Sequence, residues 1–356
     1  MRTRDLDQRH DTRVCVTIVT YNSRRFIGPC LEAVFRQNSL PLEVVVVDNA
    51  STDGTREVLG QFEGRVRLIY NDRNLGFAAG QNQAIASSAS DWVLTLNPDV
   101  LLLPGFIERL VEAGRINPKV GTVCGRLLGI GANLEPPETP RIDSAGIYFT
   151  PAMRHFDRGW NEKDDGRFQQ MEYVFGASAA AALYRREMIA DVSEAGNFFD
   201  PDFFAYREDA DVAWRAQLLG WRCIYAPAAT AYHVRRLVPG NRRAVPAVIN
   251  MHSVKNRFLM RIKNISPDLY WRNWFSITAR DAMVVLCCLL WEHSSLRAFW
   301  YLARNWRRLM AKRRAVQMRQ RVTNEYIASW FKYQPVSKQA PRRIARLLSR
   351  SQTART

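Results

Sequence analysis

The sequence predicts an α/β protein in which helices flank a mostly parallel, Rossmann-like sheet and a basic helical extension follows at the C-terminus. Two β-branched runs, residues 14–20 and 42–48, have the composition of buried parallel strands. Residues 26–37 between them repeat apolar side chains at helical spacing. The three segments therefore predict a strand–helix–strand unit with a right-handed crossover.

Polar residues follow both of these strands. Thr20, Tyr21 and Asn22 end the first strand, and Asp48 and Asn49 end the second. Ligands of parallel sheets bind beyond the carboxyl ends of the strands, and neighbouring parallel strands end at the same edge. We therefore expect these five residues to lie together at a binding edge.

The turn over residues 50–55 that follows the second strand has two interpretations. In the first, Asp53 only caps the next helix, since Asp, Ser and Thr are common in such turns. In the second, Asp48 and Asp53 bracket one ligand site at the edge of the sheet. The position of both acids beside the same strand end favours the second interpretation.

Two further strands are expected over residues 66–70 and 92–96. Between them, residues 74–80 hold two glycines among small residues, which allows the backbone to approach a ligand closely. Asp99 follows the fourth strand after Asn97. A carboxylate at a strand end suits a divalent cation that bridges to a diphosphate, although single acids there are often turn residues.

The most acidic segment of the chain is residues 199–215. Five carboxylates fall within twelve residues, and aromatic side chains are interleaved with them. A carboxyl group held against apolar surface has a raised pKa and can act as a general base. The alternative is an acidic first helical turn, which the helix dipole also favours.

Together these motifs resemble glycosyltransferase family 2 enzymes of the GT-A fold, in their bacterial rhamnosyltransferase-like branch. The resemblance covers roughly residues 13–265. It rests on six segments in the family's order, namely residues 17–22, 47–54, 74–78, 96–99, 175–177 and 203–211. Gly220, Trp221 and His233 continue the pattern.

The resemblance implies a role for each matched residue. A donor-binding set would hold the nucleotide sugar: Thr20, Tyr21, Asn22, Asp48, Asn49, Asp53, Asn74, Gly76, Asn97 and Asp99. An acceptor-side set would border the acceptor or shape the surroundings of the base: Gly176, Ala177, Glu208, Asp211 and Trp214. Asp209 matches the catalytic base. Asp99 and His233 match the metal site, where Asn97 replaces the usual first acid and leaves fewer charged ligands.

The implied reaction is an inverting transfer of a sugar, rhamnose-type favoured, from a dTDP- or UDP-sugar to a hydroxyl of a glycan or polyprenyl-linked acceptor. One base and one divalent cation, Mg²⁺ or Mn²⁺, meet its chemical needs. A sugar nucleotidyltransferase is one alternative, but residues 20–25 lack the glycines of its pyrophosphate loop. A nucleic-acid-binding protein is the other, but its body would not need acidic clefts.

Charge divides the chain. Residues 241–356 hold 24 Lys and Arg against 4 Asp and Glu, a net of +20, while residues 1–240 hold 27 against 30, a net of −3. We expect a polar arm over residues 1–13, a catalytic domain over 14–265 with donor (14–121) and acceptor (122–265) halves, a basic amphipathic extension over 266–333, and a mobile basic tail over 334–356.

One helix is expected from residue 296 to about 321, with Trp306 on its apolar stripe and arginines elsewhere. Such a helix favours contact with an anionic membrane surface over packing on the body or binding nucleic acid. The longest apolar run, residues 282–291, is about half the roughly 20 residues of a membrane span. No signal peptide is visible, and the cysteines have no zinc spacing. We therefore expect a cytoplasmic enzyme, peripheral at the inner membrane face.

Residues 122–175 show little regular pattern. Residues 142–146 and 158–160 within them also resemble the rhamnosyltransferase-like branch. We expect this region to fold over the donor site as a flexible cover. A cover that excludes water would limit hydrolysis of the donor, which competes with transfer.

Overall fold

The structure is a computed structural model that describes residues 12–37, 40–235 and 246–332. The expected N-terminal arm, apart from Thr12 and Arg13, and the expected basic tail over 334–356 lie outside these residues.

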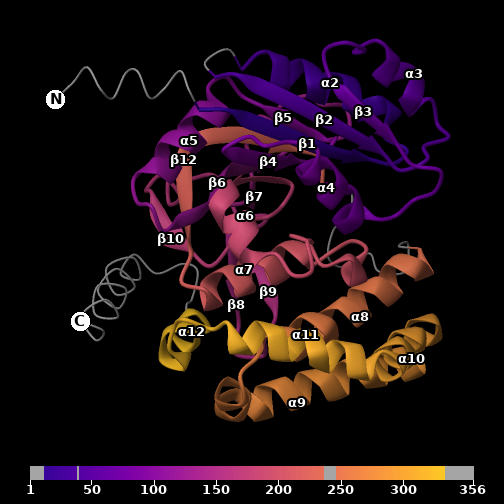
Figure 1. The fold of residues 1–356 in the computed structure, drawn as a ribbon, viewed down its shortest axis with the longest axis vertical. Coiled ribbons are helices and arrows are strands. Elements are labelled where there is room, and N and C mark those ends of the chain that lie inside the picture. Colours follow the sequence, from indigo (N-terminus) through magenta and orange to yellow (C-terminus); the bar gives the residue numbers. More distant parts are fainter. Residues whose placement is uncertain (1–11, 38–39, 236–245, 333–356) are drawn as a thin grey trace.

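A sheet of ten strands forms the centre of the molecule (Figure 1). Its path runs β10-β12-β6-β11-β4-β1-β2-β3. The donor half contributes four parallel neighbours: β1 (Val14–Thr20), β2 (Leu42–Asp48), β3 (Arg67–Tyr70) and β4 (Trp92–Leu96). Both expected β-branched runs therefore form central strands, and the register places Thr20 directly beside Asp48.

The acceptor half extends the same sheet with mixed directions. In this half β11 (Ala181–Arg185) runs antiparallel to both of its neighbours, β4 and β6 (Val120–Gly129). Next, β12 (Arg222–His233) runs parallel to β6. Short strands complete the sheet and a separate hairpin: β5 (Val100–Leu102), β7 (Ile142–Ser144), β8 (Ile147–Phe149), β9 (His155–Asp157) and β10 (Glu172–Val174).

Helices cover both faces of the sheet, because both faces are apolar. One buried cluster joins the sheet to α2 (Arg24–Phe35) and α5 (Phe106–Arg115). The cluster on the other face includes α4 (Phe77–Ala86), α6 (Arg186–Val192) and α7 (Glu208–Leu218). A short α3 (Thr55–Gly60) follows β2. This arrangement confirms the expected α/β fold with a mostly parallel sheet flanked by helices.

Five helices after the sheet form a separate layer, which we call the helical layer: α8 (Ala247–Asn264), α9 (Pro267–Leu290), α10 (Arg297–Arg304), α11 (Trp306–Met318) and α12 (Asn324–Trp330). Figure 1 shows this layer on the side of α7, away from β1, β2 and β3. A third buried cluster joins Trp214 of α7 to Leu259 of α8 and Leu309 of α11. The expected helical C-terminal extension is therefore confirmed.

The prediction of a single helix over residues 296–321 is wrong. The chain forms α10 and α11 instead, and the break falls at Asn305, whose side-chain amide donates to the Tyr301 carbonyl at 2.8 Å. Several α11 cations also point into the protein: Lys312 lies 2.6 Å from Asp200, and Arg313 donates to the Ile262 carbonyl. For α11 the packed alternative therefore describes the structure better than a solvated basic face.

The expectation that no apolar stretch reaches the length of a membrane span is also wrong. Helix α9 has 24 residues and is long and apolar enough to cross a membrane by length and composition. Arg280 and Asp281 interrupt the apolar run in the sequence. In the structure both lie inside α9, and Asp281 forms an ion pair with Arg261 of α8.

Residues 122–175 are more regular than expected. They contain β6 to β10, and Asp143 and Arg158 are almost fully buried. Arg158 lies over the rings of Phe168 and Tyr225. The motif over residues 142–146 and 158–160 is therefore a packed wall of the site rather than a loose cover.

Candidate active site

The carboxyl ends of β1 and β2 bring Thr20, Asn22 and Asp48 together, as expected. The backbone of Asn49 donates to the Thr20 carbonyl at 2.9 Å, and Asn22 accepts from the Thr52 amide at 2.9 Å. Tyr21 is about half exposed beside them. The result is an ordered polar edge with one aromatic side chain open to solvent.

Asp48 is fully buried at this edge, and only one of its oxygens is satisfied by the protein. Its Oδ2 atom accepts from Arg56 Nε at 2.7 Å and from the Ser51 amide at 3.2 Å. Within the described parts of the chain, Asp48 Oδ1 and Thr20 Oγ1 have no hydrogen-bond partner. Because buried polar atoms are normally paired, these two mark a place where a ligand would bind.

Asp53 takes the capping role that was the alternative interpretation. Its Oδ1 atom accepts from the Thr55 backbone and hydroxyl groups, and its Oδ2 atom accepts from the Arg24 amide at 3.1 Å. It therefore joins the starts of α2 and α3. The side chain is still exposed beside Asp48, so the capping role leaves it accessible.

The glycine-rich turn differs from the expectation. Gly76 has a φ of +85°, and a Cβ there would lie 2.5 Å from the ring and carbonyl of Phe204. Asn74 accepts from the Gly76 amide, and Asn49 donates to the Gly76 carbonyl. The expectation of a close ligand approach is therefore wrong for Gly76. The glycine instead lets the donor-side turn contact the acidic segment.

On the acceptor side, a line of ion pairs joins three strands, β12, β7 and β9, to Asp99 in the turn before β5. His233 at the end of β12 lies 2.7 Å from Asp143 of β7 and 3.5 Å from Asp99. Arg235 then binds Asp143 and Asp157 of β9, each at 2.5 Å. The pairing of β5 with β12 places His233 next to Val100, and so beside Asp99. Asn97, two residues before Asp99, is half-buried.

An open cavity of about 380 Å³ borders this line of ion pairs. Its walls include three members of the line and the tryptophan of the 158–160 motif. The lining residues are Gly129, Ile130, Gly131, Pro137, Thr139, Arg141, Ile142, Asp143, Trp160, Asn161, His233 and Arg235. A cavity of this size, with an aromatic ring and fixed charges in its wall, fits part of a small polar ligand.

The Nε2 atom of His233 lies 3.5 Å from Asp99, and Nδ1 of the same ring lies 2.7 Å from Asp143. A carboxylate behind the ring is the usual support for a metal-binding histidine, so these residues fit the expected metal pair. Burial opposes a charge on His233, but its bonds to Asp143 and Asp99 raise its pKa to about 9. No set of three acidic, His or Cys side chains converges on an ion site within the described ranges.

Asp209 lies in the first turn of α7. Its Oδ1 atom accepts from the Ala210 amide at 2.7 Å and its Oδ2 atom from the Ala179 amide at 3.2 Å. Burial, with the charge of Asp157 next in size, raises the pKa of Asp209 to about 6. The side chain is half-buried, so a ligand can reach a carboxylate that readily accepts a proton.

The neighbouring acid, Glu208, titrates differently. It is buried, and burial followed by the charge of Asp209 raises its pKa well above the usual range. Glu208 therefore holds its proton more strongly than an ordinary glutamate, while Asp209, with a pKa of about 6, is mostly ionised at neutral pH. Two acids whose surroundings separate their pKa values in this way commonly have different roles in one site.

The loop before α7 has an unusual backbone. Phe204, Tyr206 and Arg207 all have φ between +65° and +74°. Their position is held from the helical layer, because Asn256 Nδ2 lies 2.8 Å from the carbonyls of Phe203, Ala205 and Tyr206. Strained residues of this kind concentrate at functional sites, where the surrounding structure maintains them.

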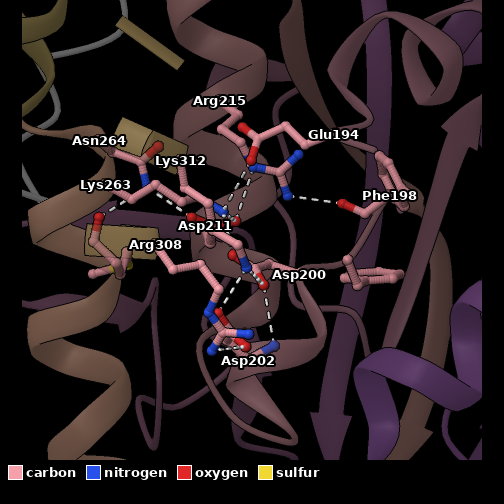
Figure 2. Close-up of polar contacts among 12 residues, drawn as sticks. Glu194, Phe198, Asp200, Asp202, Asp211, Arg215, Lys263, Asn264, Arg308 and Lys312 are labelled. Atoms are coloured by element: carbon pink, nitrogen blue, oxygen red, sulfur yellow. Dashed lines mark hydrogen bonds and ion pairs between the residues drawn. The ribbon is translucent and has the colours of Figure 1, made fainter. Parts of the chain in front are cut away.

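Asp211 and Trp214 are in the interior, which corrects the expectation that they lie on the acceptor side. Asp211 accepts from Lys263 at 2.8 Å, from Asn264 at 2.7 Å and from Arg215 at 2.8 Å, as Figure 2 shows. Trp214 is buried among aromatic rings. Neither side chain reaches solvent, because the helical layer covers this face of α7.

Gly176 and Ala177 are also buried. A Cβ at Gly176 would lie 2.3 Å from the Ala213 side chain, so the glycine allows α7 to pack closely. The same loop continues to Ala179, whose amide binds Asp209. Gly176 and Ala177 therefore help to position the loop that holds Asp209. Because both are buried, the structure does not support the expected direct contact with an acceptor.

Sequence reasoning missed three members of the site: Asp143, Asp157 and Asn256. Asp143 lies in a motif that was recognised but given no role. The signal available was its position in a run of family-like residues. Asp157 and Asn256 carry no local signal, since their partners are more than 45 residues away along the chain.

Comparisons with known proteins identify the family of the chain. A model of glycosyl transferase family 2 matches residues 15–193. N-acetylglucosaminyl-diphospho-decaprenol L-rhamnosyltransferase of Mycobacterium tuberculosis (strain ATCC 25618 / H37Rv) is 29% identical over 237 residues, which cover 61% of this chain and 75% of that protein. The putative teichuronic acid biosynthesis glycosyltransferase TuaG of Bacillus subtilis (strain 168) is 34% identical over 102 residues, covering 28% and 40%.

Among solved structures, mannosyltransferase PcManGT from Pyrobaculum calidifontis in complex with GDP-Man and Mn²⁺ matches with a TM-score of 0.49 and 18% identity over 93% of each chain. The family match spans half of the present chain. It decides against the sugar nucleotidyltransferase and nucleic-acid-binding alternatives. The chain belongs to glycosyltransferase family 2, and it is an enzyme that transfers a sugar from a nucleotide-sugar donor.

Proposed function

We propose that the enzyme transfers a rhamnose-type sugar, with inversion, from a dTDP- or UDP-sugar to a hydroxyl of a polyprenyl-linked glycan. The observation that carries the mechanism is the half-buried Asp209, held by the amides of Ala179 and Ala210, whose pKa of about 6 lets it accept a proton near neutral pH. The sugar and acceptor follow the name of the Mycobacterium tuberculosis relative, which specifies an L-rhamnosyl transfer to a decaprenol-linked sugar.

In this mechanism Asp209 removes the proton of the acceptor hydroxyl as that oxygen attacks the anomeric carbon. One displacement inverts the configuration, and no covalent enzyme intermediate is needed. The amides of Ala179 and Ala210 hold the two carboxylate oxygens in place.

The donor would bind along the edge formed by β1 and β2. The unpaired Oδ1 of Asp48 and Oγ1 of Thr20 offer an acceptor and a hydroxyl to the nucleoside. Tyr21, exposed beside them, offers a ring face. Asn22, Asn49, Asp53, Asn74 and Asn97 remain proposed donor contacts on the same side of the sheet.

Asp99 and His233 would hold a divalent ion, Mg²⁺ or Mn²⁺, and the donor diphosphate and water would complete its ligands. When bound, the ion neutralises charge on the leaving diphosphate. Asp143 supports His233 from behind. A lipid-linked acceptor would place the enzyme at the inner face of the cell membrane as a peripheral protein.

The proposal is tested by product analysis. Purified enzyme is incubated with a panel of dTDP-, UDP- and GDP-sugars and a soluble analogue of a prenyl-diphospho-sugar, and proton NMR reads the anomeric configuration of the product. We expect turnover with dTDP-rhamnose and an inverted product. A retained configuration, or preference for a different donor, would contradict the corresponding part of the proposal.

The metal site has its own test. We expect Mn²⁺ to bind wild-type enzyme in the presence of nucleoside diphosphate, measured by electron paramagnetic resonance, and to bind the Asp99→Asn variant more weakly. Exhaustive chelation should abolish transfer. Full activity after chelation would instead assign neutralisation of the leaving group to a cation such as Arg235; the other candidate, Arg236, lies outside the described residues.

A further inference from the structure

Helix α9 carries an apolar face that the described protein leaves uncovered. Its inward face is the row Leu269, Ile277, Val284 and Cys288, which are buried. Its outward face includes Trp271 and Phe275, which are 68% and 70% exposed. Leu286 and Leu289 continue this outward face, since separations of three, four, seven or eleven residues return to the same side of a helix.

We propose that this outward face of α9 lies in the headgroup region of an anionic membrane and holds the enzyme there with the helix parallel to the surface. This inference rests on the proposed function, because a polyprenyl-linked acceptor is available only at a membrane. It replaces the expected surface, a basic helix over residues 296–321, with a surface made mainly of apolar side chains.

The apolar character of α9 carries the argument. A helix that is apolar on all sides is normally surrounded by protein or lipid. Here one side packs on the helical layer, and the other holds tryptophan, phenylalanine and leucine in contact with solvent. Trp291, just past the end of the helix, is also mostly exposed. Aromatic rings of this kind are enriched at membrane–water interfaces.

The packing of α9 decides that it lies along the membrane instead of crossing it. Leu269 and Ile277, in its first half, belong to the buried cluster that contains Trp214 of α7. Val284 and Cys288, in its second half, pack with Val254 of α8 and Ala298 of α10. Because both halves are packed on other helices of the protein, the helix cannot cross a bilayer without leaving the layer.

Charge favours lipid over a second copy of the chain. Residues 246–332 hold 16 Lys and Arg against 4 Asp and Glu, a net of +12. Arg297, Trp300 and Arg304 share one exposed face of α10, and Arg304 lies 5.3 Å from the Trp300 ring. Two copies joined through these faces would bring like charges together, whereas anionic headgroups would neutralise them.

The location suits the proposed reaction. Figure 1 shows the helical layer, with α9 at its outer edge, on the side of α7 opposite to β1, β2 and β3. Asp209 lies in the first turn of α7. The loop before α7 is held by Asn256 of α8, which belongs to the helical layer. A membrane at α9 would therefore lie on the acceptor side of the enzyme and leave the nucleotide edge in water.

The test compares vesicle binding of two matched variants of the full chain. Phe275→Gln/Leu286→Gln removes two outward residues of α9, and Ile116→Gln/Met171→Gln removes two exposed apolar residues outside the helical layer. Vesicles contain phosphatidylcholine alone or mixed with phosphatidylglycerol. We expect the α9 variant to bind the mixed vesicles at least about tenfold more weakly than wild type and the control to bind as wild type.

Two further arms examine charge and depth. Arg297→Gln/Arg304→Gln should weaken binding to the mixed vesicles by roughly tenfold and leave the weaker binding to neutral vesicles unchanged. Brominated lipids should quench Trp271 and Trp291 from the same shallow depth, each assigned by its Trp→Phe variant. Unequal or deep positions would mean that the helix spans the bilayer, and this would overturn the in-plane arrangement.

The remaining outcomes are equally decisive. Equal vesicle binding by wild type and the α9 variant, or no binding by wild type, would overturn the proposal. So would a wild-type dimer in light scattering that the α9 variant dissociates, because a second copy would then cover the face. Nucleoside diphosphate binding and turnover of a soluble acceptor analogue serve as independent readouts. If they persist when vesicle binding is absent, this inference fails and the proposed reaction stands.

Discussion

Two pairs of acids in the segment from Asp200 to Asp211 contrast sharply, although their sequence surroundings are alike. Asp200 and Asp211 bind cations of the helical layer: Lys263 lies 2.9 Å from the first and 2.8 Å from the second. Glu208 and Asp209 lie between them in the chain and have no ion pair of this kind among the contacts that the structure records. The partner, and not the residue type or its burial, separates the structural acids from the reactive ones.

The pKa values follow the same division. Burial opposes ionisation of Asp200, but the ammonium groups of Lys263 and Lys312 hold its pKa well below the usual range. Burial and neighbouring carboxylates raise the pKa of both Glu208 and Asp209. Asp200 is therefore held in the charged form, whereas Asp209 accepts a proton more readily than an ordinary aspartate.

The largest expected effect comes from removing the carboxylate that acts as the base. Asp209→Asn should lower kcat by a factor of about 10² to 10⁴, because it removes the base. Its free energy of unfolding should stay the same or rise, since a raised pKa means that ionised Asp209 is a cost to the fold. The measurements are steady-state kinetics and thermal unfolding, with calorimetry of donor binding.

Asp211→Asn is the matched control for Asp209→Asn, because it makes the same change at an acid that is paired with cations. It should lower the free energy of unfolding, because Lys263 and Arg215 would lose a buried counter-charge. Near-normal turnover in Asp209→Asn would assign the base to Glu208 and remove the contrast between the pairs.

Lys263→Met breaks the buried ion pairs that Lys263 forms with Asp200 and Asp211. Removing one partner of a buried ion pair typically costs about 3–5 kcal/mol, because the other charge is left buried. We expect a loss of that size in urea unfolding. The double variant Lys263→Met/Asp211→Leu should recover part of the loss, and a double variant no more stable than Lys263→Met would show that the pair is not the source of the effect.

A pH series separates the two pairs, because Asp209 and Asp200 take up protons at different pH values. Asp209 must be ionised to accept a proton, so kcat/KM should fall about tenfold per pH unit as pH drops below about 6. The pKa of Asp200 is lowered by folding, so its contribution to stability is present above an unfolded value of about 3.9 and is lost below it. Activity should therefore decline while the protein is still fully folded. Simultaneous loss of both would contradict the separation.

The smallest expected effect is at Asn256, which joins the two regions. Asn256→Ala removes the amide that holds the strained loop before α7. We expect a stability loss of about 1–3 kcal/mol. We also expect a larger fall in kcat than in donor affinity, because the base is displaced while the β1 and β2 edge is intact. Asn250, which lies in the same helix but is partly exposed, supplies a control as Asn250→Ala, with no change expected in the split between kcat and donor affinity.

How far the sequence predicts this enzyme differs between its halves. The runs over residues 14–20 and 42–48 became β1 and β2 as expected, because β-branched side chains in a continuous apolar run signal a buried strand locally. Strands β7 to β10 went unrecognised because each is only three residues long, which is too short for a pattern in the sequence. Asp48 and Asp99 were recognisable from their positions after strands, and Asp143 was not.

The sequence by itself determined the family, the parallel sheet, and the acids and strand ends that can form a site, because those signals lie within a few residues of one another. Only the tertiary structure decided which acids are reactive. Asp211 is neutralised by Lys263, 52 residues later in the chain, and Asp200 by Lys312, 112 residues later. It also decided that α11 turns cations inward and that α9 presents an apolar face outward. Both outcomes depend on which surfaces meet on folding, and no local pattern of residues contains that information.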